Sequence, residues 1–340
     1  MISRVSPVCE ATESPLISSF SVMILWPMLG LPRISRNVGK SPGRTMIFPL
    51  SVLNNRVYSD RCQQNFRPMS ILVILILLAL LWWLWQGHPV RYLIYPAPGI
   101  SVGDPPSGMA ELFLPVQGDT RVHGWLAHSS AGPSSSPMLL YFHGNGENLE
   151  TMRLTGLCQL LKSLAGTVLM IDYPGYGRST GKPSEENLIQ AGEVAADYLL
   201  GRFPDRPLVI AGWSLGAAVA VQVAARRREQ VRGVILMSPW SSLPEVAAEH
   251  YPAWLVRLVV KEKYDSVEAA RQVDCPTLIL HGGADAIIPP TQGRAVADAL
   301  PRSEFREIPR RHHNDLLSEP EVWELIRRFL KNQGNIFDFS

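Results

Sequence analysis

The chain has 340 residues, of which 46% are hydrophobic and 18% are charged, a composition typical of a globular protein. A net charge of only +2 gives no sign of the basic face that a nucleic-acid partner requires, so none is expected. The four cysteines show neither a CxxC spacing nor a neighbouring His cluster, which argues against a zinc site.

Residues 1–68 carry eight basic and three acidic side chains, with serine and proline scattered throughout. No helical or strand period persists across them, so this segment cannot bury a core of its own and is predicted to be disordered. The alternative is that translation begins at Met69, directly before a strongly apolar run.

The run from Ile71 to Trp85 contains only apolar residues. Counted from Met69, it reaches about the lower limit for a membrane-spanning helix, roughly 17 residues. Its tryptophans cluster at the C-terminal end, where an interfacial aromatic belt would lie. We therefore expect residues 69–88 to form a single transmembrane anchor. Two alternatives are less favoured. A buried core helix would rarely lack a polar face, as this run does, and a cleaved signal peptide would show a small-residue cleavage site, which is missing here.

Basic residues decide the orientation of such an anchor. If residues 1–68 are made, their basic side chains keep the N-terminus in the cytoplasm and send the following domain across the membrane, into the periplasm in a bacterium. If translation starts at Met69, Arg91 is the only nearby charged side chain and weakly favours the opposite orientation. We expect the first orientation, in which the domain that follows the anchor is translocated across the membrane.

Residues 89–340 alternate between short apolar runs and helical patterns. This alternation predicts an α/β domain with a mostly parallel sheet and helices on both faces. Two earlier strands flank a turn-like Gly-Asp pair and should form a hairpin. The expected strands are Glu111–Pro115, Arg121–Ala127, Met138–Phe142, Thr167–Ile171, Leu208–Ala211, Gly233–Met237, Thr277–Leu280 and Phe305–Ile308. The expected helices are Asn148–Ser163, Ser184–Phe203, Leu215–Arg228, Gln292–Leu300 and Glu321–Leu330.

The sequence Gly-Trp-Ser-Leu-Gly around Ser214 matches the pattern G-x-S-x-G. The pattern alone is weak, but here a predicted strand runs into it and a helix rich in small residues leaves it. This strand–turn–helix setting is typical of a nucleophile elbow, whose tight turn needs glycine on both sides of the serine. Ser214 is therefore the candidate nucleophile.

A serine nucleophile needs a base to remove its proton and an acid to orient that base. Asp285 lies in the loop that leaves the strand Thr277–Leu280, on the ligand side of a parallel sheet, and is the best acid. The base should follow the next strand, where His312 and His313 are adjacent. Spacing alone does not separate these two histidines.

The segment His-Gly-Asn-Gly-Glu-Asn, residues 143–148, follows another strand and has the position of an oxyanion-hole loop. The backbone amides of Asn145 and Leu215 are the candidate donors. Helix capping by Asn145 or Asn148 is compatible with this role. Asp172 begins a Gly- and Pro-rich turn, and we expect it to stabilise that turn, with Arg178 as a possible partner.

Together HGNGEN, DYPGYGRSTGKPSE, GWSLGAAVA and HGGADAIIP with HHND resemble the membrane-anchored serine hydrolases with an α/β-hydrolase domain, which include depalmitoylases and lysophospholipases. The resemblance covers roughly residues 70–332. It implies an α/β-hydrolase fold, with Ser214 as nucleophile, Asp285 as acid and His313 as base. In the family a small residue, often glycine, usually stands where this chain has His312.

The expected function is hydrolysis of a carboxylic ester or thioester through an acyl-enzyme intermediate, without metal or organic cofactor. The anchor and an apolar stretch in a predicted lid at about residues 240–272 suggest a lipid-like or acylated substrate at a bilayer. A serine peptidase or amidase with the same triad and a non-catalytic membrane scaffold are the alternatives. The sequence specifies neither the acyl group nor an oligomeric state.

Overall fold

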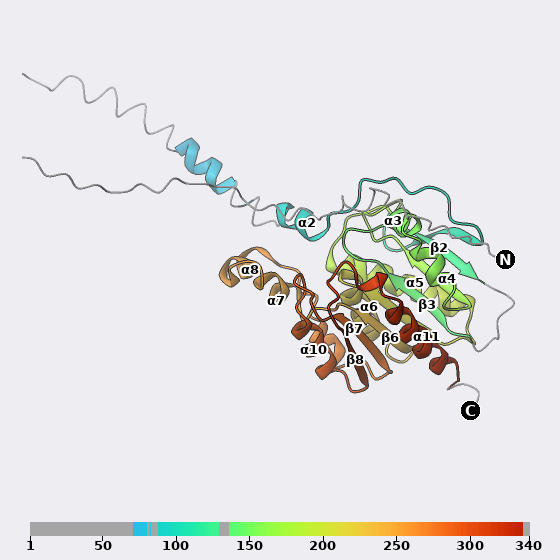
Figure 1. The fold of residues 1–340 in the computed structure, drawn as a ribbon. Helices are drawn as coiled ribbons and strands as arrows, with labels where there is room; N and C mark the ends of the chain where they lie inside the picture. Colours follow the sequence, from blue (N-terminus) through green and yellow to red (C-terminus); the bar gives the residue numbers. More distant parts are fainter. Residues whose placement is uncertain (1–70, 80–81, 83–87, 129–135, 336–340) are drawn as a thin grey trace, which may run out of the picture. The chain divides into compact units, whose positions relative to one another are not determined.

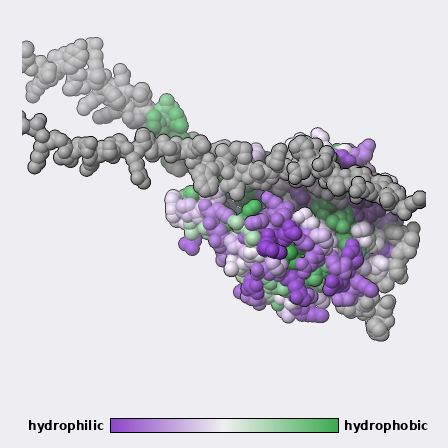
Figure 2. Space-filling model, in the orientation of Figure 1, coloured by the Kyte–Doolittle hydropathy of each residue, from purple (hydrophilic) through white to green (hydrophobic). Residues whose placement is uncertain are grey.

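The computed structural model describes residues 71–79, 82, 88–128 and 136–335. The expected disordered segment 1–68 and part of the expected anchor 69–88 lie outside these residues. Residues 71–79 are helical, their side chains are exposed, and they form a uniformly hydrophobic surface (Figure 2). Over the described part of the chain, no helix is both long enough and apolar enough to cross a bilayer. The anchor therefore stays a prediction.

Eight strands form one sheet in the order β1-β2-β4-β3-β5-β6-β7-β8 (Figure 1). β2 is antiparallel to both of its neighbours, which confirms the hairpin, and all remaining pairs are parallel. The strands are β1 (Met109–Pro115), β2 (Arg121–His128), β3 (Met138–Phe142), β4 (Thr167–Ile171), β5 (Leu208–Trp213), β6 (Val231–Met237), β7 (Thr277–Gly282) and β8 (Ser303–Ile308).

The expected helices are present, with one interruption. Residues 148–163 form two short helices rather than one, because Gly156 adopts a left-handed conformation (φ 80°) that ends the first helical segment. The helices are α2 (His88–Ile94), α3 (Leu149–Leu154), α4 (Leu157–Lys162), α5 (Glu185–Arg202), α6 (Leu215–Arg226), α7 (Leu243–Ala248), α8 (Ala253–Val259), α9 (Ser266–Ala270), α10 (Pro290–Ala299) and α11 (Pro320–Asn335).

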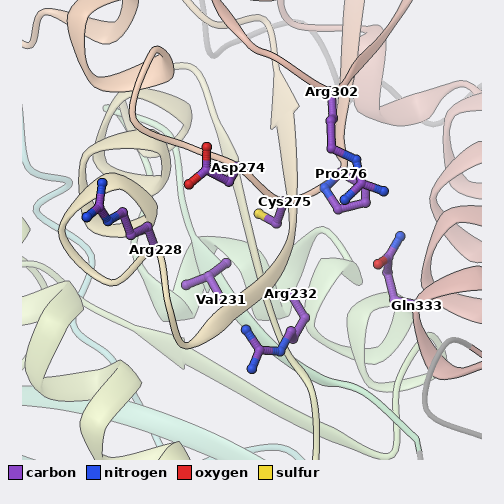
Figure 3. Close-up of a pocket in the computed structure, with 8 residues that line it drawn as sticks. All are labelled: Arg228, Val231, Arg232, Asp274, Cys275, Pro276, Arg302 and Gln333. Atoms are coloured by element: carbon purple, nitrogen blue, oxygen red, sulfur yellow. The ribbon is translucent and has the colours of Figure 1, made fainter. Parts of the chain in front are cut away.

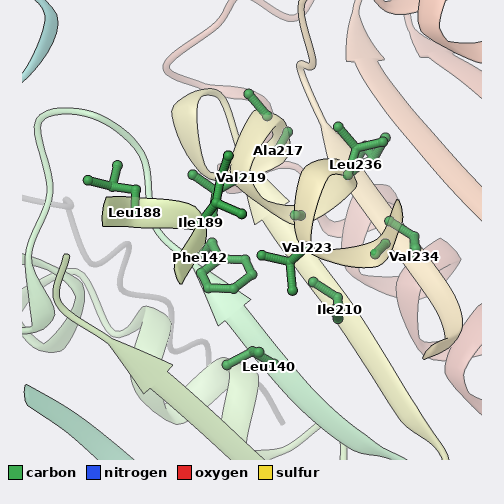
Figure 4. Packing of buried hydrophobic residues seen from close by; sticks show 14 of the residues in the cluster. Leu140, Phe142, Leu188, Ile189, Ile210, Ala217, Val219, Val223, Val234 and Leu236 are labelled. Carbon is green, nitrogen blue, oxygen red and sulfur yellow. The ribbon is translucent and has the colours of Figure 1, made fainter. Parts of the chain in front are cut away.

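Successive side chains of the central strands enter two separate hydrophobic cores. Leu140 and Phe142 of β3 pack on the side of α5, α6, α9 and α10 (Figure 4). Leu139 and Tyr141 of the same strand pack on the side of α3, α4 and α11. Because helices cover both faces, every residue of β3 and β4 is buried, which explains why these strands are continuous apolar runs in the sequence. The predicted mostly parallel sheet with helices on both faces is confirmed.

We expect two glycines of α5 to respond oppositely to alanine. A Cβ on Gly192 would lie 2.7 Å from Val223 and 2.8 Å from Phe142, whereas a Cβ on Gly201 would meet nothing within 4 Å. Gly192→Ala should therefore lower the free energy of unfolding by about 1–3 kcal/mol through overpacking. Gly201→Ala should raise it by up to about 1 kcal/mol, because alanine favours a helix. Denaturant unfolding of the full chain in detergent measures both; stabilisation by Gly192→Ala would contradict the close packing.

Candidate active site

Ser214 occupies a sharp turn between β5 and α6. Its backbone has φ 57° and ψ −117°, a region that non-glycine residues seldom adopt. The flanking glycines make this turn possible. A Cβ on Gly212 would lie 2.1 Å from the carbonyl oxygen of Gly216, and a Cβ on Gly216 would lie 2.1 Å from the carbonyl oxygen of Phe142. Ser214 is thus held at the carboxyl end of β5 by backbone contacts that exclude larger residues.

The structure brings Ser214, Asp285 and His313 together. Nε2 of His313 lies 3.0 Å from Oγ of Ser214, and Nδ1 of His313 lies 2.7 Å from Oδ2 of Asp285. All three residues are buried, with between 4% and 8% of their surfaces exposed. The arrangement has the connectivity of a nucleophile, a base and an acid that orients the base.

Asp285 remains ionised although it is buried. Burial opposes its ionisation, but the hydrogen bond and the charge interaction with His313 outweigh burial and hold the pKa of Asp285 below its ordinary value. Its other oxygen, Oδ1, accepts hydrogen bonds from the amides of Ile287 and Ile288, at 3.0 and 2.8 Å. These amides fix the carboxylate so that only Oδ2 faces the imidazole.

Backbone contacts also join the loops that carry Asp285 and His313. The amide of Gly283 donates to the carbonyl of Ile308, and the amide of Ala284 donates to the carbonyl of Arg311, both at 2.9 Å. A Cβ on Gly282 would lie 2.4 Å from the same carbonyl of Arg311. The loops after β7 and β8 are therefore pressed together, which sets the distance between the two side chains.

Three other histidines lie near these loops, and one of them, His281, also approaches Asp285, with Nε2 3.6 Å from Oδ2. His312 is exposed, and among the described residues its ring makes no hydrogen bond. His281 is buried, its Nε2 lies 2.8 Å from the carbonyl of Ile288, and burial lowers its pKa, so it is neutral. His250 is exposed and its Nε2 lies 2.8 Å from the carbonyl of Ile287.

The two candidate oxyanion donors belong to different elements. Leu215 is the first residue of α6, and Asn145 lies in the loop after β3. Within the described residues, neither backbone amide donates a hydrogen bond to a protein acceptor. Asn148 caps α3 by accepting a hydrogen bond from the amide of Thr151 at 2.9 Å, so the capping role and the loop coexist.

Two tyrosines that the sequence reasoning missed hold the loop after β3. The hydroxyl of Tyr173 donates to the carbonyl of His143 at 2.8 Å, and that of Tyr176 donates to Oδ1 of Asn145 at 3.0 Å. Both side chains are fully buried, and their rings pack edge to face. Both belong to the DYPGYG turn after β4, so the signal was present, but nothing in the sequence shows which loop that turn contacts.

Asp172 differs from the expectation in its partners. It does not pair with Arg178, which contacts Glu111 of β1 instead. Asp172 is fully buried, accepts a hydrogen bond from the amide of Leu149 at 2.9 Å, and lies 3.2 Å from Nδ1 of His123. The carboxylate therefore joins the start of α3 to the hairpin, instead of stabilising its own turn through Arg178 as expected.

The loop after β3 also contains a carboxyl group that titrates near neutral pH. The amide of Gly144 donates to Oε2 of Glu147 at 2.8 Å, and burial raises the pKa of Glu147 to about 7.

The indole of Trp213 packs against this loop, close to Gly144, and stacks on His313 with ring centroids 5.3 Å apart. Across the described ranges, no group of three or more His, Cys, Asp or Glu side chains could hold a metal ion.

Comparison with known proteins agrees with this fold. The alpha/beta hydrolase fold family matches residues 137–263. An uncharacterised protein of Mycobacterium tuberculosis, Rv2307c, is 36% identical over 274 residues, which are 77% of this chain and 94% of that protein. Protein bem46 of Schizosaccharomyces pombe is 30% identical over 64% of this chain and 75% of its own length. The lysophosphatidylserine lipase ABHD12 of Rattus norvegicus is 28% identical over 72% of this chain and 67% of its own length.

Solved structures show the same fold at lower identity. The esterase Pf2001 of Pyrococcus furiosus superposes with a TM-score of 0.57 at 16% identity, covering 69% of this chain and 98% of the esterase. Est1E of Butyrivibrio proteoclasticus, solved with ferulic acid bound, has a TM-score of 0.55 at 20% identity, covering 65% of this chain and 98% of Est1E. From its fold and its relatives, the chain belongs to the α/β hydrolase family.

Proposed function

We propose that this protein is a serine hydrolase that cleaves carboxylic esters or thioesters through an acyl-enzyme intermediate. The observation that carries the proposal is the continuous contact from Asp285 through His313 to Ser214, which stands at the sharp turn between β5 and α6. A buried imidazole within hydrogen-bond distance of a serine hydroxyl can act as its base. No step of the proposed reaction needs a metal or an organic cofactor.

The chemistry follows from the positions of the atoms. Nε2 of His313 takes the proton of the Ser214 hydroxyl as Oγ attacks the acyl carbon, and the carboxylate of Asp285 stabilises the imidazolium. The amides of Leu215 and Asn145 bind the oxyanion of the tetrahedral intermediate. When this intermediate collapses, the imidazolium gives its proton to the leaving alcohol or thiol. Water then attacks the acyl-serine by the same route and releases the acid.

We expect Ser214→Ala and His313→Ala to lower kcat by a similar factor, on the order of 10³ or more, because residues that act as one unit show similar losses. His312→Ala is the matched control, since its exposed ring contacts none of the three residues, and it should keep most activity. Hydrolysis of p-nitrophenyl esters by the purified full chain, with fluorophosphonate labelling of the serine, measures this. Full activity of Ser214→Ala, or a larger loss in His312→Ala, would refute the assignment.

The same assay separates the alternatives. A serine peptidase or amidase would turn over aminoacyl amides faster than esters, and a scaffold protein would not react with the fluorophosphonate probe. We favour the esterase because ABHD12 of Rattus norvegicus, a relative that is named for an activity, is a lipase.

Tyr176 is proposed as a positioning residue for the oxyanion loop. Tyr176→Phe removes the hydrogen bond that holds the Asn145 side chain. The backbone N–H of Asn145 should then lose its alignment with the oxyanion. We expect kcat to fall by about tenfold with little change in KM, because the oxyanion forms only in the transition state. The control is Tyr198→Phe on α5, whose hydroxyl makes no hydrogen bond in the described part of the chain. Equal effects of the two changes, or a loss confined to KM, would count against this role.

A lipid-like substrate at a bilayer is the finer part of the proposal. Exposed apolar side chains gather on α8, where Trp254 is 69% and Leu258 is 63% exposed, one helical turn apart. On α2, Tyr92 and Leu93 are exposed as well. Tyr95, just after α2, hydrogen-bonds to Glu262 and Tyr264, so the end of α2 adjoins the segment that follows α8. Apolar surface of this kind is typical of interfacial contact, and it agrees with the predicted anchor and lid.

We expect Trp254→Ser and Leu258→Ser to lower hydrolysis of long-chain acyl esters presented in phospholipid vesicles several-fold, because less apolar area enters the bilayer. Hydrolysis of the soluble p-nitrophenyl acetate should not change. Leu154→Ser, at a leucine on α3 that is equally exposed (61%), is the control and should have no effect on either substrate. A loss on the acetate ester as well would place these residues in the fold or the catalytic site instead.

A further inference from the structure

A cavity with a volume of about 270 Å³ lies at the end of the sheet opposite to Ser214, Asp285 and His313 (Figure 3). Ser214, Asp285 and His313 follow the carboxyl ends of β5, β7 and β8. The cavity instead surrounds the amino ends of β6, β7 and β8, closed on one side by α11. Because β7 has six residues, the amino and carboxyl ends of the strands are about 20 Å apart. The lining residues are Arg228, Val231, Arg232, Asp274, Cys275, Pro276, Arg302 and Gln333.

The cavity carries an excess of positive charge, with three arginines against the one carboxylate of Asp274. The neighbouring Arg226 and Arg227 pair with acidic residues of α5. By contrast, no carboxylate among the described residues lies within 4.0 Å of a nitrogen of the three lining arginines. Within the described ranges, the guanidinium group of Arg232 donates a hydrogen bond only to the carbonyl of Glu229, at 2.6 Å. These guanidinium groups are therefore available to an anion.

Gln333 adds an uncharged hydrogen-bonding side chain to the cavity lining. Only 4% of its surface is exposed, yet its carboxamide makes no hydrogen bond within the described residues. In Figure 3 this carboxamide extends from α11 toward Arg302 and Pro276. Solvent still reaches the oxygen and nitrogen of the carboxamide, so a ligand that enters the cavity can hydrogen-bond to them. Gln333 therefore offers donor hydrogens in the same space as the arginines.

Cys275 does not neutralise the site. Burial raises the pKa of its thiol to about 11, although the nearby positive charges of Arg302 and Arg232 oppose that shift. The thiol is therefore uncharged at neutral pH.

We propose that this cavity binds a small phosphate-bearing dianion through Arg232, Arg302 and Gln333. The planar guanidinium group matches the oxygens of phosphate and can donate two hydrogen bonds at once. The excess of two positive charges matches a dianion. The volume leaves room for a small organic group beside the phosphate, so both free phosphate and a phosphate monoester share the recognising chemistry. The proposal does not depend on the proposed hydrolase activity.

Equilibrium dialysis of the full chain in detergent, at constant ionic strength, tests the site with radiolabelled inorganic phosphate. We expect saturable binding that sulfate displaces and acetate does not. Arg302→Gln and Arg232→Gln should each weaken it at least about tenfold, because each removes a charge-assisted hydrogen bond. Asp274→Asn should tighten it, because it removes the only negative charge in the lining. Displacement by glycerol 3-phosphate at lower concentration than by phosphate would assign the site to a monoester, and the reverse order to the free ion.

The matched control is Arg306→Gln. Arg306 lies on β8, is exposed, pairs with Glu304 at 2.8 Å and does not line the cavity, yet its replacement removes the same charge. It should bind phosphate like the unmodified protein. Binding that is not saturable, that acetate displaces as well as sulfate, or that Arg306→Gln weakens as much as Arg302→Gln would overturn the proposal.

Discussion

Two backbones approach each other closely beside Ser214, the proposed nucleophile. The first turn of α6 touches the end of β3 at Gly216, where a Cβ would lie 2.1 Å from the carbonyl oxygen of Phe142. This approach places the amide of Leu215 beside the loop that begins at His143. Ser214 is thereby forced into its unusual conformation and stands at the edge of the sheet. A methyl group at position 216 would separate these elements, and the serine would lose the loop that faces it.

A second contact of the same kind determines where His313, the proposed base, lies. Gly282 allows the loop after β7 to touch the carbonyl of Arg311 in the loop after β8, and two backbone hydrogen bonds hold the loops together. Side chains then complete the geometry over short distances only: the carboxylate of Asp285 reaches the imidazole of His313, which reaches Ser214. Long flexible side chains have no part in it, so little conformational entropy is lost when the reacting groups meet.

Features that depend on local sequence could be predicted. Continuous apolar runs marked the buried strands, because both faces of a parallel sheet are covered, and the glycines around Ser214 marked the turn. Features that depend on contacts between distant segments could not. Spacing did not separate His312 from His313, because the choice depends on how the loop after β8 folds onto its neighbour. The hydrogen bond from Tyr176 to Asn145 joins residues far apart in the chain, and so does the cavity that Gln333 lines. The break at Gly156 was missed because a single glycine is tolerated within many helices.

The backbone of Ser214 also has a consequence for how the protein changes under mutation. A non-glycine residue in such a conformation costs about 1–3 kcal/mol, a sizeable part of the roughly 5–15 kcal/mol that separates folded from unfolded domains. Glycine would adopt the same angles without that cost, so losing the hydroxyl and gaining thermal robustness coincide at this position. Selection for stability alone would favour an inert protein here. A serine at this position is therefore maintained against the thermodynamic preference of its own backbone, and directed-evolution screens that score only folding would be expected to remove it.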